Sequence, residues 1–226
     1  SNLRLAGGGG AAILPSVSAR WQAITGQFIR EGYGLSETSP VVAFNPASVT
    51  AFSGSTGLPL PSTDVLLLDD QGHPVPLGQP GEVCVKGPQV MGGYWQQPEA
   101  NAAAFTPDGY FRTGDIGQLD ERGFLKIVDR KKDMVIVSGF NVFPNEVEAV
   151  ATACPGVLEC ACIGVPDEKT GEALRLYVVR AAGTAPPVDA DHIAAHCRAA
   201  LTAYKVPRQI VFVAVSYTHL RAHETP

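Results

Sequence analysis

One short segment places an aromatic ring, a hydroxyl and a carboxylate within five positions, at residues 31–38 (EGYGLSET). Glycines on both sides of Tyr33 would leave its ring accessible to a flat partner such as adenine. Ser36 could donate to a phosphate oxygen, and the Glu37 carboxylate could bind Mg²⁺. The segment predicts a nucleotide site, with a turn around a half-buried tyrosine as the alternative.

A run of small residues lies upstream, at residues 7–12 (GGGGAA). Glycine N–H groups can approach a phosphorylated ligand closely, and the spacing fits a dinucleotide-binding fingerprint. Glu31 follows Ala12 by nineteen residues, where a ribose-binding acid would lie. However, Pro15 is expected to break the helix that such a fingerprint must open, so a flexible loop is equally compatible. A Rossmann oxidoreductase, which needs a parallel βαβ unit here, is disfavoured.

A further carboxylate, Asp115, follows glycine in residues 111–115 (FRTGD). Its two oxygens could accept both hydroxyls of a ribose, although a lone aspartate after glycine also suits a turn.

Five consecutive charged residues, 129–133 (DRKKD), separate two apolar segments that are predicted strands. A run of this kind is not expected in a core. It predicts either a solvated hairpin turn or an exposed hinge between two domains.

The elements that must position these residues alternate between strands and short helices. Before the charged run we expect strands at 3–6, 27–31, 65–69, 82–86 and 124–128, with helices at 17–25 and 99–104. After it we expect strands at 134–137, 157–164, 174–180 and 209–214, with helices at 144–153 and 190–201. The pattern indicates an α/β body with a small β-barrel or sheet, followed by an α+β domain.

Composition excludes several classes of function. The chain has 226 residues, a formal net charge of −5 and 45% hydrophobic residues, and it shows no basic stripe, so nucleic acid is not an expected partner. No apolar run approaches the roughly 18 residues that a membrane-spanning helix needs. The five cysteines are irregularly spaced among apolar neighbours, which indicates buried thiols in a reducing compartment such as the cytosol rather than structural zinc.

Five motifs occur in order at residues 31–38, 86–95, 113–115, 129–133 and 137–148. Together they closely resemble those of the adenylate-forming (AMP-binding) ligases, and most closely those of bacterial long-chain fatty-acid–CoA ligases. The resemblance extends from about Leu3 to Val213, nearly the whole chain. Among the motifs, residues 86–91 and 140–144 favour the fatty-acid branch.

The resemblance implies a set of nucleotide contacts in the first part of the chain. Tyr33, with Gly34 beside it, would stack on adenine. Ser36, where the family usually has threonine, would bond the α-phosphate, and Glu37 would bind Mg²⁺. The adenine edge would be lined by Gly8, Gly9, Gly10 and Ala11.

It also implies roles for residues further along. Asp115 would hold the ribose hydroxyls, assisted by Arg130. Lys132 would be the hinge about which a small C-terminal domain turns between two half-reactions. Gly139 would line the tunnel for the pantetheine arm of CoA, where a side chain would obstruct it. Ser36, Glu37 and Lys132 are thus the candidate catalytic residues.

The implied reaction uses ATP, Mg²⁺ and CoA to activate a long-chain fatty acid through an acyl-AMP. The expected organisation is the end of a large mixed-sheet AMP-binding domain at 1–129, a truncated small α+β domain at 130–215, and a non-native tail at 216–226. The expected location is the cytoplasm, compatible with peripheral contact at the inner face of the membrane.

Two parts of the family pattern are not found in these residues: a Ser/Thr/Gly-rich phosphate loop, and a catalytic lysine after the final strand, since no lysine follows Lys205. We therefore expect an active parent enzyme and an inactive fragment. The alternatives are another adenylating enzyme, such as a luciferase-like or peptide-synthetase adenylation domain, or a non-catalytic nucleotide-binding module.

Overall fold

The computed structural model describes residues 3–183 and 186–214. The chain divides into two compact units, one ending at Lys131 and the other beginning at Lys132, and each is described by itself. The predicted mixed α/β class is confirmed.

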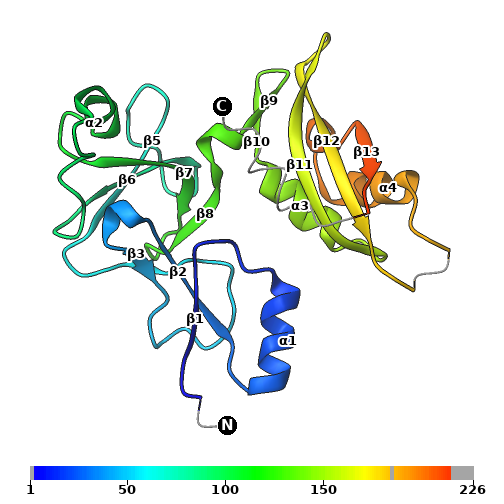
Figure 1. Cartoon of the computed structure of the whole chain (residues 1–226), viewed down its shortest axis with the longest axis horizontal. Coiled ribbons are helices and arrows are strands. Elements are labelled where there is room, and N and C mark those ends of the chain that lie inside the picture. Colours follow the sequence, from blue (N-terminus) through cyan, green and yellow to red (C-terminus); the bar gives the residue numbers. More distant parts are fainter. Residues whose placement is uncertain (1–2, 184–185, 215–226) are drawn as a thin grey trace. The chain divides into compact units, whose positions relative to one another are not determined.

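The first unit holds two four-stranded sheets, in the orders β1-β2-β3-β4 and β5-β6-β7-β8 (Figure 1). The strands of the first sheet are β1 (Ala6–Gly8), β2 (Ile29–Gly34), β3 (Val41–Phe44) and β4 (Leu58–Pro59). Those of the second are β5 (Asp64–Leu68), β6 (Gly81–Lys86), β7 (Phe111–Leu119) and β8 (Leu125–Arg130). Two helices complete the unit, α1 (Pro15–Thr25) and α2 (Pro98–Ala104).

The chain start forms a parallel βαβ unit, which the sequence analysis had disfavoured. Strand β1 pairs in parallel with β2, and α1 connects them. Pro15 begins α1 instead of breaking it, because a proline in the first turn has no helical N–H partner to lose. The expectation for Pro15 was therefore wrong. Strand β2 then pairs antiparallel with β3, so the sheet does not continue as a purely parallel one.

One apolar cluster packs the two sheets of this unit together. Alternate residues of β6, Val83 and Val85, are fully buried and meet Val42 and Ala43 of β3. Leu67 and Leu125 extend the cluster along β5 and β8. Side chains alternate between the two faces of a strand, so Val83 and Val85, two positions apart, lie on the same face of the second sheet. That face packs against the first sheet.

Strand β7 pairs antiparallel with both β6 and β8, and Asp115 lies opposite Arg130. Ile116, the residue after Asp115, is 7% exposed, and its side chain lies on the face of the sheet opposite to that of Asp115. The pairing with β8 shifts between Ile116 and Gly117, so an irregularity follows directly after the site residue.

The charged run 129–133 is not uniformly solvated, which corrects the sequence-based expectation. Asp129 is 1% exposed, and its carboxylate accepts a hydrogen bond from the N–H of Arg130. Lys131 is half-buried and pairs with Glu82 and Asp70, both at 3.1 Å. The run is also no hairpin turn, because β8 and the next strand belong to different sheets.

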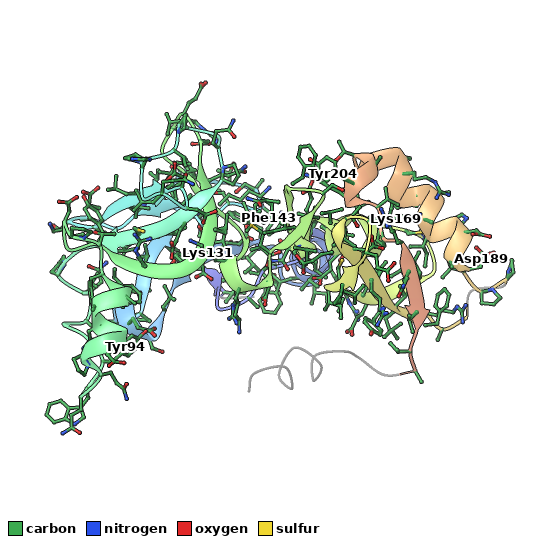
Figure 2. The ribbon with its side chains drawn as sticks, turned by 90° about the horizontal axis from the view of Figure 1, so that it is seen from above. Tyr94, Lys131, Phe143, Lys169, Asp189 and Tyr204 are labelled. Carbon is green, nitrogen blue, oxygen red and sulfur yellow. The ribbon has the colours of Figure 1, made fainter. Side chains whose placement is uncertain are left out.

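The second unit is an α+β sandwich, with strand order β10-β9-β12-β11 and β13 parallel to β12. Its strands are β9 (Val135–Val137), β10 (Phe140–Val142), β11 (Val157–Asp167), β12 (Gly171–Arg180) and β13 (Gln209–Phe212). Its helices are α3 (Pro144–Thr152) and α4 (Ala190–Ala200), and Asp189 caps α4 by accepting from the N–H of His192 (Figure 2).

Buried residues of β12 and the two helices form the core of this unit. Leu174, Leu176 and Val178 alternate along β12 and pack in one cluster with Val147 of α3 and Ile193 of α4. The predicted burial of the cysteines is confirmed for four of the five, Cys84, Cys154, Cys162 and Cys197, and all five are free thiols.

Candidate functional site

Tyr33 of β2 and Asp115 of β7 meet, as a shared site requires. The Tyr33 hydroxyl donates to Oδ2 of Asp115 at 2.6 Å. Burial, and then the charge of Asp115 and the hydrogen bond to it, raise the pKa of Tyr33, so the hydroxyl remains a proton donor at neutral pH. The N–H of Asp115 in turn donates to Oγ1 of Thr113, which donates to the Val83 carbonyl.

The glycines beside Tyr33 have a different role from the one expected. A Cβ at Gly34 would lie 1.7 Å from the Pro40 carbonyl oxygen, and one at Gly32 would lie 2.6 Å from the Phe44 ring. Glycine is therefore required for the close approach of β2 and β3. The Tyr33 ring itself is half-buried and packs on one side against the cluster between the sheets, and strand packing explains the glycines beside it.

The glycine run lies next to the strand that carries Tyr33. A Cβ at Gly9 would lie 2.8 Å from the carbonyl oxygen of Gly32, and Gly8 is the register partner of Glu31. Gly10 has a φ of +81° in open space, and Ala11 is exposed. The structure thus brings the predicted adenine-edge loop and the predicted stacking residue to the same end of β1 and β2.

Ser36 and Glu37 lie in a single 3₁₀ turn, Ser36–Thr38, directly after β2. Thr38 is fully buried, and its hydroxyl accepts from the N–H of Leu35, which fixes the turn. Ser36 is exposed, as a phosphate-binding hydroxyl would need to be. Glu37 is half-buried, and its Oε1 accepts from the Tyr94 hydroxyl at 3.0 Å.

Glu37 suits a magnesium ion that is shared with a nucleotide. No group of three or more His, Cys, Asp or Glu side chains that could hold a metal occurs within residues 3–183 and 186–214. Mg²⁺ is commonly bound through one or two carboxylates together with substrate phosphates and water. A single carboxylate beside an exposed serine hydroxyl fits that pattern.

The remaining predicted residues lie at the end of the first unit and in the second. Arg130 is exposed and opposite Asp115 in the β7–β8 pairing. Lys132 is exposed and is the first residue of the second unit. Gly139 and Ser138 form the turn between β9 and β10, with φ values of 83° and 52°. A Cβ at Gly139 would meet open space, so within this unit glycine is explained by its positive φ.

Three residues of the site were not singled out from the sequence. Thr113 supports Asp115, Tyr94 bonds Glu37, and Asn101 of α2 bonds the main chain of Tyr94. Thr113 and Tyr94 lie within motifs that the sequence analysis used, whereas Asn101 carries no signal in the sequence.

Among the residues that the structure describes, no helix has both the length and the apolar character required to cross a bilayer.

Two family profiles match the chain. The profile described as AMP-binding enzyme matches residues 1–95, and that described as AMP-binding enzyme C-terminal domain matches residues 146–218.

Curated proteins and solved structures are similar over nearly all of the chain. A long-chain-fatty-acid–CoA ligase of Yersinia pestis is 52% identical over 94% of this chain and 37% of its own length. A protein of the same name from Escherichia coli O6:H1 is 50% identical over the same shares. The crystal structure of ATP-bound MatB from Rhodopseudomonas palustris has a TM-score of 0.88 and 38% identity, over 94% of this chain and 42% of that one.

Proposed function

Because the chain belongs to the AMP-binding enzyme family of adenylate-forming ligases, we propose that its parent protein activates a long-chain fatty acid with ATP and transfers it to CoA. The chain spans 37% of the length of the curated relatives named above, so this activity concerns the longer protein. The 2.6 Å hydrogen bond between Tyr33 and Asp115 carries the proposal for the site, because it joins two predicted nucleotide contacts from distant segments.

In the first half-reaction the fatty-acid carboxylate attacks the α-phosphorus of ATP, which gives acyl-AMP and releases pyrophosphate. Such a transfer depends mainly on positioning and on neutralisation of charge. Tyr33 and the loop at Gly8–Ala11 hold the adenine, and Asp115, with Arg130 beside it, accepts the ribose hydroxyls. Ser36 donates to the α-phosphate, and Glu37 binds the Mg²⁺ that offsets phosphate charge.

In the second half-reaction the thiol of CoA attacks the acyl carbonyl and AMP leaves. Lys132 is the pivot for the change between the two half-reactions, which agrees with its place as the first, exposed residue of the second unit. Gly139 leaves room for the pantetheine arm, since no side chain projects from the β9–β10 turn at that position.

Residues 1–226 alone are proposed to be inactive. No lysine follows Lys205 in this sequence, and none of its segments resembles the phosphate loop of the family. Loss of a preorganised cation at the reacting phosphate costs on the order of several kcal/mol in transition-state stabilisation.

The test is an assay of the full-length parent and of residues 1–226 with ATP, Mg²⁺, CoA and either oleate, benzoate or an amino acid. We expect the parent to release AMP and form acyl-CoA with oleate, and the short chain to release no AMP above the blank. Preference for benzoate would contradict the long-chain assignment, and preference for an amino acid would favour a peptide-synthetase type of enzyme. Nucleotide binding without turnover of any acid would favour a non-catalytic module.

A further inference from the structure

Glu37 is held by a segment more than fifty positions away in the chain. Its carboxylate Oε1 accepts from the Tyr94 hydroxyl at 3.0 Å, and its carbonyl oxygen accepts from the N–H of Met91 at 2.8 Å. One residue is therefore fixed at both its main chain and its side chain by the same loop, residues 91–94.

That loop is in turn fixed by Asn101 of α2. Oδ1 of Asn101 accepts from the N–H of Tyr94 at 2.6 Å, and Nδ2 donates to the Tyr94 carbonyl at 2.9 Å. Gly93 has a φ of +135°, and a Cβ there would lie 2.9 Å from the Asn101 amide oxygen. Figure 2 shows Tyr94 beside this helix. Because both hydrogen bonds clamp the Tyr94 main chain, the direction of its side chain is restricted.

Tyr94 lies partly at the surface. It is 38% exposed and its neighbour Trp95 is 86% exposed, so the hydrogen bonds of Asn101 as well as packing hold Tyr94 in place. The Tyr94 hydroxyl donates to Oε1 of Glu37 at 3.0 Å. The hydroxyl is thus a donor aimed at one carboxylate oxygen.

We propose that Tyr94, clamped by Asn101, is a positioning residue that orients the Glu37 carboxylate for the magnesium ion of the bound nucleotide. The proposal rests on the proposed function, in which Glu37 binds that ion. Donation to one carboxylate oxygen restricts rotation of the group and directs the other oxygen at the ion. Side chains that orient a metal ligand in this way typically alter metal affinity about 10- to 100-fold when they are removed.

The decisive variant is Tyr94→Phe in the full-length parent, because it deletes only the hydroxyl. Asn101→Ala is the second variant, since it releases the clamp and leaves the hydroxyl in place. The matched control is Tyr110→Phe, which also deletes a tyrosine hydroxyl that donates to an exposed carboxylate, that of Asp64. Two readouts are measured: Mn²⁺ affinity by electron paramagnetic resonance with a non-hydrolysable ATP analogue, and the Mg²⁺ dependence of acyl-AMP formation.

We expect Tyr94→Phe to weaken Mn²⁺ binding about tenfold and to raise the half-saturating Mg²⁺ concentration by a similar factor, with kcat at saturating Mg²⁺ largely retained. Asn101→Ala should move both quantities in the same direction, and Tyr110→Phe should move neither.

Three results would overturn the proposal: unchanged Mn²⁺ affinity in Tyr94→Phe, tighter binding in that variant, which would make Tyr94 a competitor of the metal, or an equal effect in Tyr110→Phe. Failure of the unsubstituted parent to form acyl-AMP at any Mg²⁺ concentration would instead refute the proposed function.

Discussion

The Tyr33 hydroxyl and the Asp115 carboxylate lie 2.6 Å apart, and β2 and β7, which carry them, belong to different sheets of the first unit. The bond restricts the orientation of the Asp115 carboxylate before any ligand binds. A preorganised acceptor does not have to be ordered when the ribose hydroxyls arrive, which lowers the entropic cost of binding.

Replacing Asp115 by alanine in the parent should raise the apparent KM for ATP about tenfold or more, because both ribose hydroxyls lose a charged acceptor. The KM for CoA should change much less. The measurement is initial-rate kinetics at varied ATP, and an unchanged KM for ATP would remove Asp115 from the ribose role.

The variant Tyr33→Phe distinguishes the contribution of the ring from that of the hydroxyl, because it removes only the hydroxyl. The variant keeps the aromatic face but removes the hydrogen bond from Tyr33 to the charged Asp115, so the free energy of unfolding should fall by about 1.5–3 kcal/mol. The KM for ATP should rise less than in Asp115→Ala. Denaturant titration of the parent checks the first statement, with Tyr110→Phe as the control because its hydroxyl bonds an exposed aspartate. Equal losses of unfolding free energy in the two variants would show that the Tyr33–Asp115 hydrogen bond stabilises the protein no more than the exposed Tyr110–Asp64 bond does.

Lys132→Pro should leave acyl-AMP formation largely intact while blocking thioester formation, because proline fixes φ at the proposed pivot. Lys132→Ala, which keeps the backbone free, should retain both steps. The two steps are measured separately, by pyrophosphate exchange and by acyl-CoA release. Parallel loss of both in the proline variant would argue against the pivot.

Burial of the Glu31 carboxyl is expected to make the free energy of unfolding depend on pH. The residue is 8% exposed, and burial raises the pKa of its carboxyl from 4.5 to about 7, against smaller opposing effects of the Gly54 N–H and of Lys126. The folded state therefore binds this proton more tightly than the unfolded state does. Its stabilising contribution is complete below about pH 4.5 and is lost as the pH rises through about 7.

The variant Glu31→Gln should remove this dependence. Relative to the unsubstituted parent, its melting temperature should be higher at pH 8 and the difference should shrink toward pH 5. Thermal unfolding of both proteins across that range tests the prediction. A difference that stays constant with pH would show that Glu31 does not titrate in this way.

The second unit could be predicted closely from local signals. Pro144 marks the start of α3, and alternating apolar residues predict β12. The expected elements pass directly from the strand at 134–137 to the helix at 144–153, without strand β10. Its register depends on the positive φ values of that turn, which the types of the flanking residues do not determine.

In the first unit the errors concern one local signal, Pro15 interpreted as a helix breaker, the unexpected strands β3 and β4, and several long-range contacts. The charged run 129–133 gave no sign that Asp129 is buried or that Lys131 pairs with Glu82, because the partner lies 49 positions away. The glycines on both sides of Tyr33 are explained by the segment of β3 that packs against them. Residue types alone therefore indicated the candidate site, and only the tertiary structure gave the reason for its glycines.

The placement of Asp115 and Ile116 on opposite faces of β7 determines where changes in chain length can be tolerated. Gly114, the residue between Thr113 and Asp115, has a φ of +73° and lies where the β6–β7 register shifts, so removing it would abolish this irregularity and displace the Asp115 carboxylate from Tyr33. An extra residue in the turn between Thr106 and Tyr110 would leave that alternation intact. Variation in length among natural or engineered versions of this protein should accordingly be confined to such turns.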